Sequence, residues 1–162
     1  MKIQFAIIAL VSTALLVKSC KKDDLINNQS TTPTPYVIEK TQGMPPLALP
    51  IDNPLSNEGV LLGRMLFYDP IVSLDSSISC ESCHRQDKAF TDGLKVSKGI
   101  RGQILGRNSM PLYNLMWQKK FFWDGRSKSL REQVLIPIQA HNEMDMNLYD
   151  LALKLNNNKR YS

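Results

Sequence analysis

The chain has 162 residues, of which 43% are hydrophobic and 22% are charged. This composition excludes a wholly disordered chain, a collagen-like fibre and a coiled coil, and the length leaves room for one domain with a leader. Twenty basic and 15 acidic residues give a formal charge of +5, which falls to about +3 without Lys2 and Lys18 of the leader. That charge is too small and too scattered for a nucleic-acid-binding face, so we expect no nucleic acid as a partner.

Residues 1–19 predict a secretory signal peptide. Lys2 precedes an apolar run from Ile3 to Val17, which is shorter than the ~20 residues that span a bilayer. The run leads into the segment LLVKSC, which resembles a bacterial lipobox with an atypical lysine. In that pattern Cys20 becomes the lipidated first residue of the mature protein, and plain secretion is the alternative.

Export places the protein in the periplasm or cell envelope, touching the membrane only through the lipid anchor. Residues 20–43 predict a flexible linker, because charged residues followed by Asn, Gln, Ser, Thr and Pro cannot bury a core. Residues 44–162 predict an all-α domain with long loops and few or no strands. Its first helix begins after a cap at Ser56 and ends before Asp69-Pro70.

Residues 80–84 read Cys-Glu-Ser-Cys-His, the attachment pattern of a c-type haem. Two thiols add to the two vinyl groups on one edge of a porphyrin, and the imidazole that follows binds the iron. A short helical turn meets both demands, with Ser77 or Ser79 placed as its N-cap. Cys80 and Cys83 are therefore the predicted attachment residues, and His84 is the predicted proximal iron ligand.

Two other kinds of site share part of this pattern. A redox dithiol needs no histidine after it and lies in a βαβ unit, which the sequence does not indicate. A zinc site needs further ligands, but His141 is the only other histidine and there is no fourth cysteine. We therefore expect one covalently bound haem c, which acts as a large apolar part of the core.

Beyond the haem motif, residues 86–110 predict a loop that contains glycines and lysines. A short helix is expected from Ser129 to Ile136, where Pro137 stops it. The last helix begins at Asn147 and has one apolar face, formed by Leu148, Leu151 and Leu155.

With these elements in order, the chain resembles the N-terminal half of a bacterial di-haem cytochrome c peroxidase. The resemblance runs from about residue 60 to 146, and besides the haem motif it rests on residues 62–70, 89–92, 107–108, 122–126, 130–133 and 143–144. It implies a cytochrome c-like haem domain that reduces hydrogen peroxide to water with electrons from a small periplasmic donor, a cytochrome c or a cupredoxin. It also leaves a homodimer open.

The resemblance assigns roles to four further residues. Glu143 matches the distal catalytic carboxylate, Gln133 a distal-pocket amide, and Trp123 an aromatic residue on the electron path between two haems. Asn108 matches a residue at a calcium site whose other protein ligands come from the family's C-terminal domain. A carboxylate with an ordinary pKa is ionised at neutral pH, and it can move a proton between the two oxygens of peroxide.

The sequence departs from the family in two respects. Many members hold the resting iron with a distal histidine about sixteen residues after the proximal one, but Ile100 stands there and no histidine lies between residues 85 and 140. We hypothesise that this haem lacks that ligand and needs no reductive activation; His141 is better explained as a pocket-edge or surface residue than as a ligand. The chain also has a single haem motif, so we expect it to be truncated before a second haem domain.

Two alternative functions stay open. A mono-haem electron carrier would need a sixth ligand, commonly methionine, and spacing singles out none of Met110, Met116, Met144 and Met146. A relative within the superfamily could instead use peroxide to oxidise a protein or an organic substrate.

Overall fold

The computed structural model describes residues 32–39 and 42–161, so the predicted signal peptide and Cys20 lie outside the described residues. Within the compact unit Pro33–Ser162, the described residues form helices and loops and contain no β-strand, which confirms the all-α prediction. The elements in chain order are α2 (Asn57–Tyr68), η1 (Pro70–Val72), α3 (Cys80–Cys83), η2 (Gln86–Lys88), η3 (Ile100–Gly102), η4 (Leu115–Trp117), α4 (Leu130–Gln139) and α5 (Leu148–Asn156).

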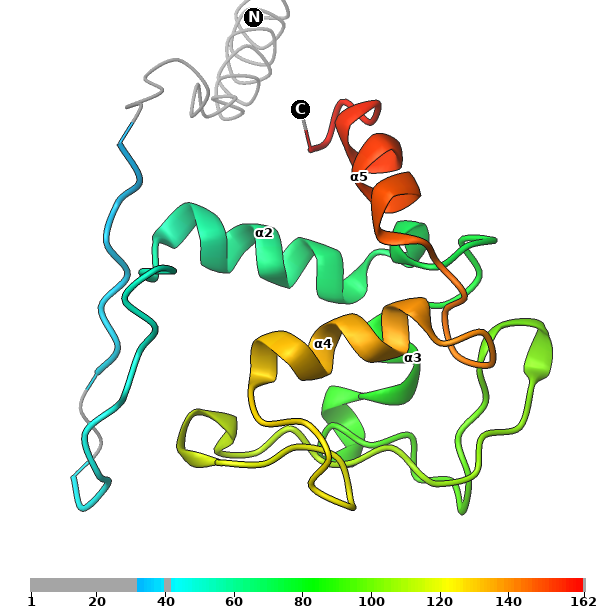
Figure 1. The fold of residues 1–162 in the computed structure, drawn as a ribbon, viewed down its shortest axis with the longest axis horizontal. Helices are drawn as coiled ribbons and strands as arrows, with labels where there is room; N and C mark the ends of the chain where they lie inside the picture. Colours follow the sequence, from blue (N-terminus) through cyan, green and yellow to red (C-terminus); the bar gives the residue numbers. More distant parts are fainter. Residues whose placement is uncertain (1–31, 40–41, 162) are drawn as a thin grey trace, which may run out of the picture. The chain divides into compact units, whose positions relative to one another are not determined.

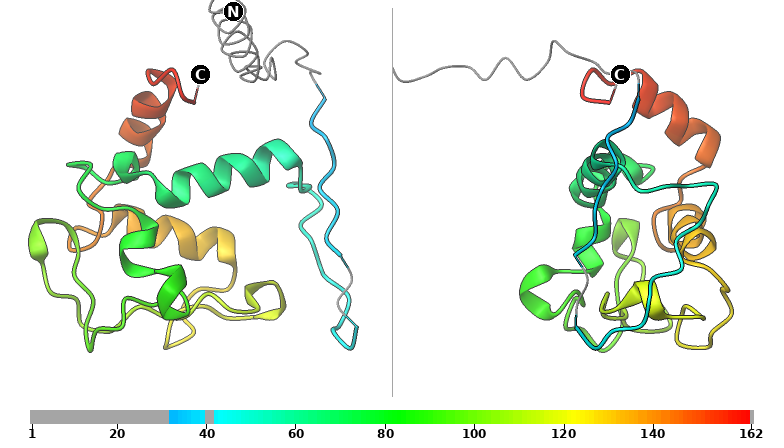
Figure 2. Two further views of the ribbon diagram at one scale, coloured as in Figure 1. Left: turned by 180° about the vertical axis from the view of Figure 1, so that it is seen from behind. Right: turned by 90° about the vertical axis from the view of Figure 1, so that its left-hand side faces the viewer.

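The short helix α3 and the longer α4 lie in the middle of this unit (Figures 1 and 2). Helices α2 and α5 lie on one side of them, and the loops between η2 and α4 lie on the other. Helix α2 contacts both α3 and η1, and α5 contacts η1. The haem motif on α3 therefore lies between the helices and the long loops.

Polar caps set the starts of the longer helices where the sequence predicts them. The side chains of Ser56, Ser129 and Asn147 each accept a hydrogen bond from a backbone amide of the first turn, at 3.0, 3.1 and 2.8 Å. Such a bond satisfies one of the free amides at a helix start, and it is typically worth ~1 kcal/mol.

The predicted stop at Pro137 is wrong, because α4 continues through this residue to Gln139. A proline inside a helix loses one backbone hydrogen bond. Here the last turn is kept by the bond from the Ala140 amide to the Ile136 carbonyl at 2.9 Å, and the Pro137 carbonyl accepts from the Met144 amide at 3.2 Å.

A small apolar core lies where α5 meets η1 and the segment after α4. It is formed by the buried side chains of Val72, Met144, Met146 and Leu151, with partly buried neighbours packed against it, among them Cys80. Met144 and Met146 are thus core residues. The haem motif is connected to this core through the first of its two cysteines.

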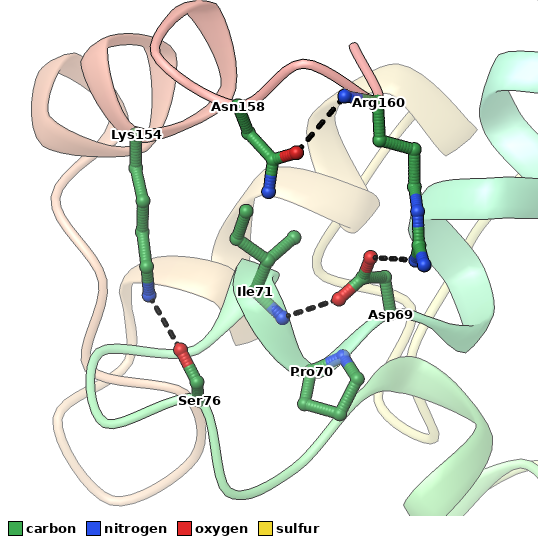
Figure 3. A pocket seen from close by; sticks show the side chains of 7 residues that line it. All are labelled: Asp69, Pro70, Ile71, Ser76, Lys154, Asn158 and Arg160. Atoms are coloured by element: carbon green, nitrogen blue, oxygen red, sulfur yellow. Dashed lines mark hydrogen bonds and ion pairs between the residues drawn. The ribbon is translucent and has the colours of Figure 1, made fainter.

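Asp69, at the end of α2, anchors the C-terminal segment (Figure 3). Its carboxylate accepts hydrogen bonds from the Ile71 amide and from Arg160 at 2.9 Å. It also accepts one from the Tyr161 hydroxyl at 2.8 Å. Lys154 of α5 donates to the Ser76 hydroxyl at 2.8 Å in the same pocket. These charges are already paired and none of the predicted site residues lines this pocket, so it serves the fold.

Segments before α2 are joined to the domain by long-range hydrogen bonds. The Tyr36 amide donates to the Leu55 carbonyl at 3.0 Å, so part of the expected linker pairs with the chain just before α2. Farther along, the Trp117 indole donates to the Pro45 carbonyl at 2.9 Å, and Arg131 makes a two-pronged ion pair with Asp52. No helix in the described part of the chain has the length and apolar character needed to cross a bilayer.

Replacing Leu151 by alanine tests the position of the core. Leu151 is 9% exposed and lies in the buried cluster, whereas Leu153 on the same helix is 45% exposed. We expect Leu151→Ala to lower the free energy of unfolding by about 2–4 kcal/mol, and Leu153→Ala to change it by no more than about 0.5 kcal/mol. Chemical denaturation of the haem-loaded protein measures both values, and equal losses would contradict this core.

Candidate active site

Helix α3 places both cysteines of the haem motif on a single turn. Cys80 and Cys83 are free thiols and both are partly buried. The turn is fixed at its start by the bond from the Ser79 amide to the Ser82 hydroxyl at 3.0 Å, so Ser79 is the N-cap. Residues three apart lie on one face of a helix, and two thiols can therefore meet one edge of a porphyrin.

His84 ends α3, and its ring is held by a hydrogen bond to the Phe90 carbonyl, 2.9 Å from Nδ1. A carbonyl can only accept, so Nδ1 carries the proton and Nε2 keeps its lone pair for a metal. The Phe90 carbonyl is placed by two successive residues with left-handed backbone, Ala89 and Phe90, each at φ 57°. Such conformations cost roughly 1–2 kcal/mol per residue and gather at functional sites.

The distribution of apolar side chains also fits a haem. Apart from the core cluster, the only buried hydrophobic residues in the described ranges are Ile100 and Phe121. Large apolar side chains are instead exposed on α4 and in the segment between η2 and α4, among them Leu94, Tyr113, Met116, Trp123, Leu130 and Val134. A domain of this size ordinarily buries more apolar surface. A porphyrin held by Cys80, Cys83 and His84 supplies an apolar surface of the missing kind.

Glu143 lies in a turn that joins α4 to α5, and its backbone is fixed on both sides. The Glu143 amide donates to the Ala140 carbonyl at 2.9 Å, and the Glu143 carbonyl accepts from the Ile100 amide at 2.8 Å. Within the described residues, no group donates a hydrogen bond to its carboxylate. The backbone is therefore held while the carboxylate stays available to a ligand.

The approach of the loop to this turn requires glycine at position 99. A Cβ built on Gly99 would lie 1.9 Å from the Asn142 carbonyl oxygen and 2.9 Å from the Glu143 Cα. Both distances are shorter than real Cβ contacts allow. The absence of a side chain at this position lets the η3 loop and the Glu143 turn meet.

The pKa values of Glu143 and Cys83 are both shifted by burial and by nearby charged side chains. Burial raises the pKa of Glu143, and the nearby Arg126 guanidinium partly opposes this. Burial also raises the pKa of the Cys83 thiol to about 11, with further contributions from the carboxylates of Asp92 and Glu143. The Cys83 sulfur lies 3.7 Å from the Lys98 carbonyl oxygen, and the neighbouring Gly99 contacts the Glu143 turn, so Glu143 lies near the haem motif. Its raised pKa differs from the ordinary value expected from the sequence, because the side chain is partly buried.

The other predicted residues lie at different depths. Gln133 is partly buried on α4 and its side chain makes no hydrogen bond with another described residue. Trp123 is 56% exposed, and its indole donates to the Asn108 carbonyl at 3.2 Å. Asn108 is itself exposed, and the described residues contain no group of three or more His, Cys, Asp or Glu side chains that could hold a metal ion.

Three residues near Glu143 were not connected with it by sequence reasoning: Gly99, Ile100 and Arg126. Each is far from Glu143 along the chain, and each belongs to a loop without a periodic pattern. The one available signal was the position of Ile100, where many relatives of the resembled family carry a distal histidine. Ile100 is fully buried.

Comparison with known proteins places this geometry in a family. Residues 57–162 match the family model of the di-haem cytochrome c peroxidases. The chain is 42% identical over 105 residues to the methylamine utilization protein MauG of Methylorubrum extorquens, a match that covers 65% of this chain and 30% of that protein. It is 38% identical over 91 residues to the cytochrome c551 peroxidase of Pseudomonas aeruginosa, which covers 56% of this chain and 26% of the relative.

A solved structure of a MauG-like protein associated with microbial copper homeostasis superimposes with a TM-score of 0.71 at 33% identity. That match covers 78% of this chain and 38% of the other. The chain thus spans less than a third of the length of the two curated relatives named above. Since the family match includes the haem motif and about two thirds of the sequence, the chain belongs to the di-haem cytochrome c peroxidase family.

Proposed function

We propose that this chain forms the peroxide-binding haem domain of an enzyme that reduces hydrogen peroxide to water, using electrons from a small periplasmic cytochrome c or cupredoxin. The observation that carries the proposal is the partly buried Glu143, whose backbone is fixed and whose carboxylate is free, near the haem motif. When bound by Cys80, Cys83 and His84, haem c supplies an iron that accepts peroxide and exchanges electrons.

Glu143 acts as the acid–base group for peroxide. Its carboxylate takes the proton from one peroxide oxygen and returns it to the oxygen that leaves as water. Proton transfer of this kind is typically worth ~10²–10⁴ in rate. The raised pKa of Glu143 brings it closer to neutral pH, which favours a group that must both accept and donate a proton.

Gln133 and Trp123 complete the proposed site. The free amide of Gln133 orients peroxide by donating a hydrogen bond, which supports charge separation as the oxygen–oxygen bond breaks. Trp123 lies exposed on the electron path toward a second haem, which a C-terminal domain would carry. At that boundary Asn108 would contribute to a calcium site with ligands from the same domain.

The remaining proposals concern the ends of the chain. Residues 1–19 form a signal peptide, and residues 20–43 carry a lipid on Cys20 and lead to a haem domain at 44–162. The mature protein is then a periplasmic lipoprotein.

A simple electron carrier is less favoured. Of the four methionines considered as its sixth ligand, Met144 and Met146 are core residues, which leaves Met110 in a loop and Met116 in η4. A second enzymatic function, within the superfamily that the sequence resembles, stays a candidate: peroxide-dependent oxidation of a protein or an organic substrate. The two enzymatic functions are separated by comparing peroxide turnover with a reduced cytochrome c and with organic reductants.

The isoleucine at position 100 supports the hypothesis that the sixth coordination position of the resting iron is free. This residue occupies the distal-histidine position and is fully buried, and His141 is exposed at the surface. We therefore expect the resting oxidised haem of this domain to bind cyanide without prior reduction. Stopped-flow absorption measures this binding, and a resting spectrum of low-spin iron with two histidine ligands would contradict the proposal.

Replacing Glu143 by glutamine removes the proposed proton acceptor while keeping size and shape. We expect Glu143→Gln to lower kcat/KM for peroxide by about 10²–10⁴-fold and to leave covalent haem content unchanged. Steady-state assays and a pyridine haemochrome spectrum measure the two quantities. Glu39→Gln, an exposed site before α2, is the matched control, and an unaffected rate in Glu143→Gln would remove Glu143 from the mechanism.

The pH dependence follows from the charges around Glu143. A base must be ionised, so activity falls as the pH drops through the raised pKa of Glu143, at a higher pH than for an ordinary carboxylate. Arg126 lowers that pKa, and Arg126→Gln should therefore move the acid limb of kcat/KM to still higher pH. The shift should shrink at high salt, because Arg126 is exposed. Arg64→Gln on α2 is the control, and an unshifted acid limb in Arg126→Gln would contradict this electrostatic link.

A further inference from the structure

The turn that carries Glu143 is joined to the η3 loop at one buried point. The Ile100 amide donates to the Glu143 carbonyl at 2.8 Å, and Gly99 allows the two backbones to touch. This joint fixes the backbone that carries the Glu143 side chain. Interactions that keep the Ile100–Glu143 bond formed therefore also keep the Glu143 carboxylate in position.

Both sides of the joint contain a residue with unfavourable backbone geometry. Arg101 in η3 has φ 54°, and Asp145, two residues after Glu143, has φ 53°. Left-handed backbone favours glycine, and other residues adopt it at a cost. Gly102, with φ 71°, stands directly beside Arg101. Arginine at position 101 and aspartate at position 145 therefore carry a backbone cost that some other interaction must offset.

The side chains of these two residues bond to each other across the joint. Arg101 donates to one carboxylate oxygen of Asp145 at 3.1 Å, and the other oxygen accepts from His141 Nδ1 at 2.9 Å. His141 lies before Glu143 and Asp145 lies after it, so the histidine bond closes the turn. The arginine bond ties that turn to the η3 loop.

We propose that Asp145 is a positioning residue for Glu143, since its carboxylate bonds to both His141 and Arg101 and thereby holds the catalytic turn against the η3 loop. The inference rests on the proposed role of Glu143 and extends it to three residues that would not touch peroxide. One carboxylate serves two donors, so a single ordered side chain supports both contacts. The lowered pKa of Asp145, caused first by the His141 hydrogen bond and then in part by Arg101, keeps it ionised at neutral pH.

The competing explanation is that aspartate merely tolerates left-handed backbone and that its ion pairs are surface contacts of no consequence. Exposed ion pairs each contribute about 0.2–1 kcal/mol to stability. Arg101 also interacts electrostatically with the carboxylate of Asp75. Asp145→Gly separates the two explanations, because glycine relieves the backbone cost and removes both contacts. The variant is therefore expected to fold.

Hydrogen–deuterium exchange of the Ile100 amide in the haem-loaded full-length protein reports on the joint directly. We expect Asp145→Gly to speed this exchange by about three- to tenfold, as loss of the two contacts predicts. The Phe121 amide, bonded to the Ser127 carbonyl at 2.9 Å, is the internal reference and should not change. Unchanged exchange at Ile100 would overturn the proposal.

Variants of Arg101 supply a matched pair, because lysine and alanine meet the same left-handed backbone. We expect Arg101→Ala to speed exchange at Ile100, by less than Asp145→Gly because the His141 bond remains, and Arg101→Lys to restore slow exchange. Asp52→Asn, which removes an exposed ion pair elsewhere, is the control. If the Ile100 amide exchanges equally fast in Arg101→Lys and Arg101→Ala, the positive charge at position 101 does not hold the joint.

Activity decides whether the joint serves catalysis. Asp145→Gly should lower kcat for peroxide with little change in KM, because it displaces the proton acceptor without touching the substrate. Faster exchange with wild-type kcat would reduce the contact to a structural one and overturn the positioning role. Full activity in Glu143→Gln would instead remove Glu143 from the mechanism, and the exchange data would still show whether the joint exists; absence of peroxide turnover in the wild-type protein would refute the proposed function.

Discussion

The hydrogen bond from His84 Nδ1 to the Phe90 carbonyl is the interaction on which the site depends. It fixes the ring orientation and leaves Nε2 as the only nitrogen able to bind iron. To place that carbonyl, the chain accepts left-handed backbone at Ala89 and Phe90. The segment after α3, which contains the short helix η2, therefore ends with the backbone that holds the His84 imidazole.

The small apolar core is the second feature that relates the fold to the haem motif. The described residues bury a small cluster where α5 meets η1, and they expose large apolar side chains around the layer that contains α3. Cys80 belongs to the edge of that cluster. Haem attachment through Cys80 would thus join the porphyrin to the protein core.

The sequence predicted the features that arise from local chemistry. The caps at Ser56, Ser129 and Asn147 follow from side-chain bonds to nearby amides, and the haem turn follows from the reach of two thiols and an imidazole. It did not predict the continuation of α4 through Pro137, since packing after the helix supplies other bonds. The raised pKa of Glu143 depends on burial by segments distant in sequence, and the contact of Gly99 with Asn142 depends on how two loops meet. No local pattern records such contacts.

Asp145 shows how a residue that does not touch the substrate can support one that does. Glycine would be the least costly residue at φ 53°, yet the chain places there a carboxylate that binds His141 and Arg101. The backbone cost is offset only if these contacts do something that glycine cannot. Glu143 has no side-chain hydrogen bond of its own in the described part of the chain, so its position depends on the backbone that carries it. A general acid–base group must keep its carboxylate free of hydrogen bonds so that it can exchange protons. Contacts that fix the backbone on either side of Glu143 can position the carboxylate without occupying it.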